Sequence, residues 1–188
     1  MIGQASLFVP EKTLPLRKRV AVERIETAQA RYALENFHYL HRTRTGRQIN
    51  YAVLIDGVVD GVITYAYPMM SAPLAGVPSD ELLEFARLYL HQNIPHTASC
   101  AIGQTLRRIR SDWLLEYPDA KTPRLVVSWS DTTRHSGTVY KAANFQWLRK
   151  SRGDKRTAPR NQADTKRGFR LNQDDMRNDK DCWIYWLK

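Results

Sequence analysis

The segment from 130 to 147, SDTTRHSGTVYKAANFQW, brings several chemically useful side chains together. Asp131 directly follows an apolar run, Thr132 and Thr133 add hydroxyl groups, and Tyr140 falls inside a short helical pattern. Ligands of open α/β sheets bind in loops at the carboxyl ends of strands. Asp131 therefore either caps a turn in this loop or holds a metal ion or a substrate amine.

A second pair of polar side chains, His38 and Tyr39, follows a helical pattern earlier in the chain. Together with Asp131 they would offer nitrogen and oxygen ligands to a metal ion. An ordinary hydrogen-bonded histidine is the alternative for His38. His41 is close enough to converge with His38 on a helix, but a surface histidine explains it better.

Arg87 lies in the segment ELLEFARLYL, which fits either a helix or a strand. The order of the neighbouring elements favours a strand. Arg87 could pair with Glu84 across a helix turn or be solvated, whereas in a strand it could point to a substrate carbonyl or phosphate group.

The residues Thr97, Ala98 and Ser99 begin a long helical pattern, and Thr97 fits the N-cap. Small residues at a helix N-terminus let a phosphate or carboxylate group approach free backbone N–H groups. These three are therefore the predicted cofactor-binding residues. Ser99 could equally be a helix-initiating residue with no other role.

Hydrophobic periodicity predicts the elements that must position these residues. Helices are expected over 22–37, 97–117 and 138–143, and strands over 49–55, 58–67, 81–90 and 124–130 and in the segments FQWLRKS and CWIYWLK. Asp56-Gly57 between two β-rich runs is a strong hairpin signal. Asn144 suits the left-handed end of a helix, after which Phe145 returns to the core. This order predicts an α/β fold in which helices flank a mixed sheet.

The length of 188 residues is most simply one domain, 1–188, with an N-terminal extension over 1–20. No apolar run is long enough to cross a membrane and the N-terminus does not have the order of a signal peptide, so we expect a cytoplasmic protein. Cys100 and Cys182 are far apart and are expected to be small core residues.

The net charge of +10 favours a polyanionic partner, with nucleic acid first. The stretch 149–180 alone carries 11 Lys and Arg residues against 5 Asp residues. It is either a solvated, partly disordered loop or an arm that binds the DNA backbone. The predicted DNA-binding residues are Arg149, Lys150, Arg152, Lys155, Arg156, Lys166 and Arg167.

The segment TVYKAANFQW resembles the Tyr-x-x-x-Gly-Phe ending of the acyl-CoA N-acyltransferase superfamily GNAT, with Asn144 where glycine is usual. This resemblance implies a single GNAT-like domain in which Tyr140 protonates the leaving group. The segment HQNIPHTASCAIG departs from the Gly-rich pyrophosphate loop of that superfamily. Acyl-CoA or another glycyl or acetyl donor is the expected co-substrate.

Four ordered motifs, FHYLH, EFARLYL, HTASCAIGQTLRRI and LVVSWSDTTRHSGTVYKAANFQWL, resemble the Mom-type phage DNA modification proteins, a divergent GNAT branch. The resemblance implies conversion of adenine in double-stranded DNA to N6-carbamoylmethyladenine, which protects phage DNA from restriction. It also implies a bound iron and functional roles for these residues: His38, Tyr39, Arg87, Ser99, Asp131 and Tyr140. We expect a homodimer.

An enzyme that acts on adenine in a duplex must expose the base and stack it on aromatic side chains. Tyr65, Tyr67 and Trp129 could do this, although core packing explains each of them as well. Two other functions stay open. One is a GNAT N-acyltransferase that acts on a small amine or a protein, and the other is a catalytically inactive DNA-binding module.

Overall fold

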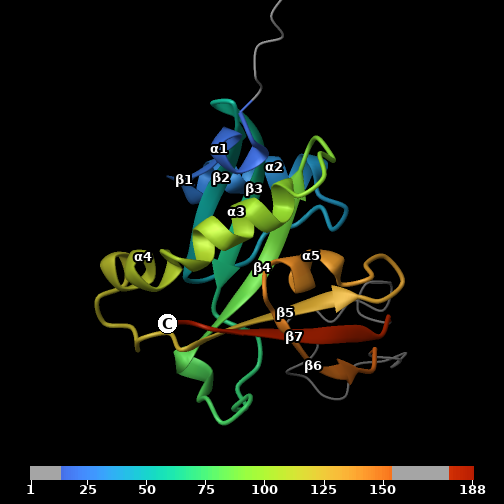
Figure 1. Ribbon diagram of the computed structural model, residues 1–188. Coiled ribbons are helices and arrows are strands. Elements are labelled where there is room, and N and C mark those ends of the chain that lie inside the picture. Colours follow the sequence, from blue (N-terminus) through green and yellow to red (C-terminus); the bar gives the residue numbers. More distant parts are fainter. Residues whose placement is uncertain (1–13, 154–177) are drawn as a thin grey trace, which may run out of the picture.

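A seven-stranded mixed sheet organises the chain, in the order β1-β2-β3-β4-β5-β7-β6 (Figure 1). This computed structural model describes residues 14–153 and 178–188. The strands are β1 (Val20–Ile25), β2 (Gln48–Ile55), β3 (Val58–Ala66), β4 (Leu82–Leu90), β5 (Leu125–Asp131), β6 (Gln146–Ser151) and β7 (Lys180–Trp186). Neighbouring strands are antiparallel except β4 and β5, which are parallel.

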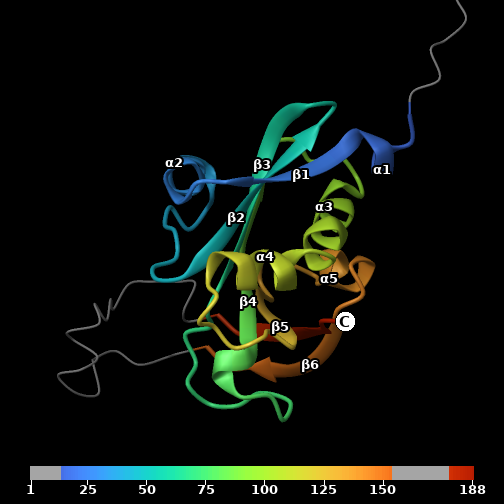
Figure 2. The ribbon, with the colours of Figure 1, turned by 90° about the vertical axis from the view of Figure 1, so that its left-hand side faces the viewer.

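Helices cover both faces of the sheet, as Figure 2 shows. The helices are α1 (Leu16–Arg19), α2 (Thr27–Phe37), α3 (Thr97–Leu106), α4 (Ile109–Glu116) and α5 (Thr138–Ala142), with a short 3-10 turn η1 (Ser79–Glu81). Helix α2 packs on β2 and β3 from one side, whereas α3 and α5 lie together on the other. The predicted α/β fold with a mixed sheet and flanking helices is confirmed. In the described residues, no helix is both long and apolar enough to cross a bilayer.

The main hydrophobic core lies between the sheet and the helices α3, α4 and α5. Its largest fully buried side chains include Tyr51, Tyr65, Trp113 and Trp183. Phe145 joins this core directly after Asn144, whose φ of 62° ends α5 as predicted. A smaller cluster around Leu74 and Val77 covers the other side of β5 and β7.

The predicted hairpin between β2 and β3 is confirmed. Asp56 and Gly57 have φ angles of 52° and 79°, which is the left-handed conformation that a two-residue hairpin turn requires. The Asp56 carboxylate also pairs with Arg19 at 2.6 Å and so ties the hairpin to the start of β1.

The single helix predicted over 22–37 is wrong in its first part. Val20–Ile25 is the strand β1, paired with β2, and its buried residues Val20 and Val22 alternate with exposed ones. This period of two is typical of a strand with one face on the core. The helix begins only at Thr27, where Glu26 and Gln29 form a capping box.

The long helix predicted over 97–117 is two helices, α3 and α4, which break at Arg107 and Arg108. After the break Ile109 and Trp113 are fully buried, so α4 turns its own apolar pair into the core. Thr97 is not the N-cap either. That position is His96, with a φ of 69°, and Thr97 is buried in the first turn.

The parallel strands β4 and β5 pair only over three residues, from Leu82↔Leu125 to Glu84↔Val127. Beyond this point β4 continues to Leu90 and β5 to Asp131, and the two strands diverge (Figure 1). The sheet is therefore open at its centre.

Candidate active site

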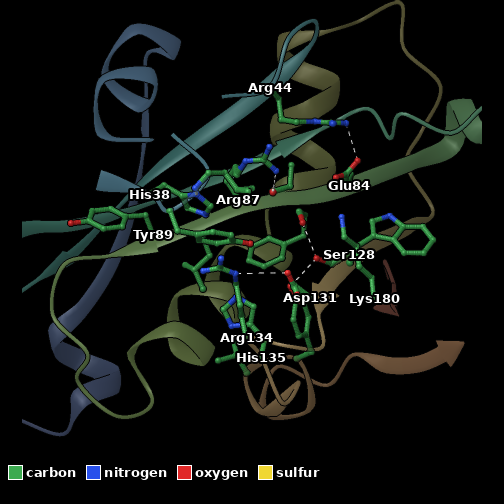
Figure 3. Close-up of a pocket in the computed structure, with 18 of the residues that line it drawn as sticks. His38, Arg44, Glu84, Arg87, Tyr89, Ser128, Asp131, Arg134, His135 and Lys180 are labelled. Atoms are coloured by element: carbon green, nitrogen blue, oxygen red, sulfur yellow. Dashed lines mark hydrogen bonds and ion pairs between the residues drawn. The ribbon is translucent and has the colours of Figure 1, made fainter. Parts of the chain in front are cut away.

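A cleft of about 1320 Å³ lies where β4 and β5 diverge (Figure 3). Its walls come from the loop after α2, the second half of β4, the end of β5 and the loop that leads into α5. Single small molecules occupy sites of roughly 300–1,000 Å³. The cleft is therefore large enough for two substrates.

Tyr140 lies at the α5 side of the cleft, and its ring is fixed by packing. The ring stacks on Trp183 with centroids 5.4 Å apart and meets Phe85 edge-on. Its hydroxyl oxygen is 3.0 Å from the Ser128 hydroxyl, which donates a hydrogen bond to the Phe85 carbonyl at 2.8 Å. Burial raises the pKa of Tyr140 to about 12. The phenol therefore keeps its proton at neutral pH and can act as an acid.

Gly137 is the N-cap of α5, the short helix that carries Tyr140. Gly137 has a φ of 76°, and a Cβ atom there would lie 2.2 Å from the Trp183 ring. Only glycine fits such a position. Gly137 thus lets α5 sit directly on the Trp183 ring that also supports Tyr140.

Asp131 lines the cleft at the end of β5 and is 3% exposed. Oδ1 accepts hydrogen bonds from the Thr133 backbone N–H at 2.9 Å and the Thr133 hydroxyl at 2.6 Å, and Oδ2 accepts one from Asn178 at 2.8 Å. Burial alone would raise the pKa of Asp131, but these hydrogen bonds lower it below its usual value. Asp131 is therefore an ionised carboxylate that holds the loop before α5.

His38 and Tyr39 reach the same cleft from the loop after α2. Their rings stack with centroids 4.5 Å apart, and the Arg134 guanidinium lies 4.9 Å from the centre of the Tyr39 ring. The Leu40 backbone N–H donates to Nδ1 of His38 at 3.1 Å. Burial and the nearby positive charge of Arg87 lower the pKa of His38 to about 4. The ring is therefore neutral and carries its proton on Nε2.

The arrangement does not support the expected iron site on His38, Tyr39 and Asp131. Among residues 14–153 and 178–188, no three His, Cys, Asp or Glu side chains are placed to hold a metal ion. Nδ1 of His38 is occupied by a backbone N–H, and both Asp131 oxygens already accept hydrogen bonds. These hydrogen bonds hold the two loops that border the cleft.

Arg87 lies on a strand, as predicted, and lines the cleft. It does not pair with Glu84, because Glu84 forms a nearly buried ion pair with Arg44 at 2.8 Å. Arg87 donates to the carbonyl groups of Ala86 at 2.6 Å and Arg42 at 3.4 Å instead. Burial lowers the pKa of Arg87. A partly buried guanidinium whose hydrogen-bond partners among residues 14–153 and 178–188 are carbonyl groups is suited to bind an anionic or carbonyl group of a substrate.

The three predicted cofactor residues lie apart from this cleft. Ser99 donates to the His96 carbonyl at 3.0 Å, Thr97 is buried, and neither they nor Ala98 are cleft-lining residues. Ser99 instead lines a separate pocket of about 570 Å³ between α3 and α5, together with Arg17 and Arg107. The structure therefore does not bring Ser99 together with Asp131 and Tyr140.

Three of the predicted DNA-binding residues are described and exposed. Arg149 and Lys150 lie on the edge strand β6, and Arg152 follows it. Ser151, Lys180 and Asp131 lie in one row across β6, β7 and β5. The basic end of β6 is therefore level with Asp131. The remaining residues, Lys155, Arg156, Lys166 and Arg167, lie outside the described residues.

Of the aromatic residues expected to stack a base, only Trp129 lines the cleft. Tyr65 is fully buried and bonded to Thr105 at 2.8 Å, and Tyr67 packs on Trp113. Sequence reasoning missed other cleft residues: Phe37, Tyr89, Ser128, Arg134, His135 and Lys180. Arg134 and His135 follow Asp131 in the same polar loop, so the sequence could have indicated them as site residues. The others become neighbours only through the fold.

The model of the Mom protein family matches residues 19–183. At the level of single sequences, no curated protein is a detectable match.

Solved structures of acetyltransferases are similar in fold. NAA60 of Arabidopsis thaliana in complex with acetyl-CoA has a TM-score of 0.56 and 13% identity, covering 89% of this chain and 98% of that one. RimL, a ribosomal L7/L12 alpha-N-protein acetyltransferase in complex with coenzyme A, has a TM-score of 0.54 and 9% identity over 92% and 97% of the two chains. A protein of Desulfovibrio desulfuricans assigned to the GNAT family has a TM-score of 0.50 and 13% identity over 90% and 99%. At such identities the likeness concerns the fold alone.

Proposed function

The chain belongs to the Mom protein family, and from this premise we propose that it is a transferase that modifies the N6 amino group of adenine in double-stranded DNA. The product implied by the family resemblance is N6-carbamoylmethyladenine, which would protect the DNA from restriction. The GNAT-like fold supports the transferase part of this proposal.

The observation that carries the proposal is the Tyr140 hydroxyl in a cleft of about 1320 Å³ between β4 and β5. In the transfer step, the N6 nitrogen forms a bond to a carbon of the donor while the bond from that carbon to its leaving group breaks. The leaving group takes the proton of Tyr140, whose raised pKa keeps this proton available. Because the carbamoylmethyl product has a CH2 group on N6, the donor is a two-carbon compound of the glycyl or acetyl class that carries its leaving group on this methylene carbon. An acyl thioester would instead give an N6-acyl adenine.

The nucleophile must also lose a proton. His135 is the proton acceptor that we assign, because it lines the cleft and its pKa is lowered, chiefly by burial. A neutral imidazole can accept a proton, whereas the strongly hydrogen-bonded carboxylate of Asp131 is a weaker base. Asp131 holds the loop that carries His135, whose backbone N–H donates to the Asp131 carbonyl at 2.9 Å.

The remaining groups would bind substrates. Arg87 is suited to the carbonyl or an anionic group of the donor. Arg149, Lys150 and Arg152 lie level with Asp131 along the sheet and would contact DNA phosphates.

The test is mass spectrometry of nucleosides from the DNA of cells that express the full chain, the Tyr140→Phe variant or the Asp131→Ala variant. We expect an adenosine derivative with a carbamoylmethyl group for the unchanged protein and its loss in both variants. Unmodified DNA from cells with abundant folded protein would refute the proposal.

A second function is favoured by the likeness to acetyltransferase folds together with the position of Tyr140. In this alternative the chain transfers an acyl group from acyl-CoA to a small amine or a protein. Turnover of acetyl-CoA on a small amine, with no change in DNA, would identify this function.

A further inference from the structure

Two aromatic rings form a shelf at the cleft mouth that the proposed chemistry does not use. Phe37, the last residue of α2, is 54% exposed and stacks on Tyr89 of β4 with ring centroids 5.9 Å apart and an interplanar angle of 18°. Both residues line the cleft, beside His38 and Arg87, and Figure 3 shows Tyr89 at its edge. Phe37 also meets the Tyr32 ring edge-to-face, with centroids 6.2 Å apart, yet about half of its surface stays exposed to a ligand at the cleft mouth.

The fold holds this aromatic shelf, Phe37 and Tyr89, in place. Tyr89 lies in the ladder between β3 and β4, opposite Val62, and its hydroxyl is 3.2 Å from Nδ1 of His91. Phe37 ends a helix that is anchored by the fully buried residues Ala30 and Leu34. The shelf is therefore available for stacking without rearrangement.

The charges around the shelf favour a nucleotide over an apolar partner. Arg87 lines the cleft beside the shelf and makes no ion pair with a described residue, whereas Arg44 is neutralised by Glu84. Lys180, which also makes no ion pair with a described residue, lines the side of the cleft away from Tyr89 (Figure 3). The chain also carries a net charge of +10. An aromatic face next to an unpaired cation is the combination that binds single nucleotides of a nucleic acid strand.

We propose that the Phe37–Tyr89 shelf receives the adenine that leaves the duplex and stacks it on the exposed face of Phe37. This rests on the proposed function, because the cleft must accept a base of DNA. A base taken out of its stack loses its neighbours, and a fixed aromatic ring replaces part of that interaction. The shelf then presents the adenine to the cleft between β4 and β5.

The experiment compares the affinity of the full chain for two short single strands. One has a central adenine between thymines, and the other has an abasic site at the central position. The unchanged protein should bind the adenine strand about 10-fold to 100-fold more tightly, the size of one stacking interaction. Phe37→Ala should lose this preference and bind the abasic strand as before, whereas Phe37→Trp should keep it.

Leu115→Ala, which removes another exposed apolar side chain outside the cleft, is the matched control and should not change the preference. If Phe37→Ala lowered the affinity for both strands equally, or changed the affinity for neither, the inference would be overturned. Asp131→Asn tests the Phe37–Tyr89 shelf independently of the proposed modification chemistry. This variant should keep the adenine preference. If DNA is never modified but the preference and its Phe37 dependence persist, the shelf stands and the proposed chemistry fails.

Discussion

Tyr140 combines a ring that is locked by Trp183 and Phe85 with a hydroxyl group at the cleft. We expect Tyr140→Phe to lower the rate of modification by about 10²-fold to 10⁴-fold, the usual contribution of a positioned proton donor. The ring contacts stay, so the free energy of unfolding should change by only about 1 kcal/mol. Nucleoside analysis over time and urea unfolding measure the two effects.

The matched control is Ser128→Ala, which removes the neighbouring hydroxyl but leaves the Tyr140 proton in place. It should cost less activity than Tyr140→Phe. Equal losses in both variants would mean that the hydroxyl pair acts through its hydrogen bonds and that Tyr140 is not the acid.

His38 makes the stability of the fold depend on pH. Its pKa is lowered to about 4 in the folded protein by burial and by Arg87, His135, His41 and Arg42, whereas in the unfolded chain histidine has its ordinary pKa of 6.5. The unfolded state therefore binds more protons between these values, so stability is present above pH 6.5 and is lost as the pH falls toward 4. The loss from about pH 7.5 to about pH 5 should be about 2 kcal/mol.

Urea unfolding of the unchanged protein and of His38→Gln at these two pH values measures this contribution. The variant should lose less stability on acidification than the unchanged protein does. An identical pH dependence in His38→Gln would contradict the assignment.

The residues of the site could be predicted from the sequence where a loop follows a strand. Asp131 and Arg87 line the cleft because each belongs to one of the two strands that diverge there. Ser99, at the start of a helix, lines a separate pocket and not the cleft, so its cofactor role stays a prediction. Lys180 and Phe37 were missed because their neighbours are distant in the chain.

At the scale of elements, α5 depends on Gly137. We expect Gly137→Ala to lower the free energy of unfolding by about 1–3 kcal/mol or more, because the φ of 76° is unfavourable for alanine and the new Cβ would lie 2.2 Å from Trp183. Since Trp183 also supports Tyr140, activity should fall as well. Thermal unfolding and nucleoside analysis test both parts.

Gly103→Ala is the matched control, since Gly103 lies inside α3 and a Cβ there would meet only the Arg107 side chain at 3.9 Å. Alanine should stabilise that helix by about 0.5–1 kcal/mol. If both substitutions lowered the free energy of unfolding equally, the close approach of Gly137 to Trp183 would not be the cause of the loss.

Most elements were predictable because their patterns are local. The hairpin at Asp56-Gly57 and the helix end at Asn144 follow from backbone preferences of a few residues. The break between α3 and α4 has no glycine or proline signal, since it depends on how Ile109 and Trp113 reach the core. Strand β1 was hidden because its residues precede a helix without a turn signal.

At the scale of the whole molecule, the cleft depends on the divergence of β4 from β5 after three paired residues. No sequence pattern predicts where two parallel strands stop pairing, because this depends on the helices packed on either face. The structure shows where these two strands part and which residues line the opening. The homodimer stays a prediction, because it depends on contacts between two copies of the chain.

The position of β6 at the Asp131 end of the sheet leads to a prediction for DNA binding. Neutralising Z phosphates gives a slope of about −0.9Z in a plot of log K against log salt concentration. The double variant Arg149→Gln with Arg152→Gln should therefore make this slope less steep by about 1.8 if each side chain contacts one phosphate. Fluorescence anisotropy with a labelled duplex over a salt series measures the slope.

Lys121→Gln is the control for charge alone, because Lys121 is exposed and precedes β5 at the opposite end of the strand from Asp131. It should leave the slope unchanged. If all three substitutions changed the slope equally, the DNA would respond to the net charge of +10 and not to the end of β6. A flatter slope in the double variant alone would place the phosphate backbone beside the cleft, where an extruded adenine can reach Phe37 and then Tyr140.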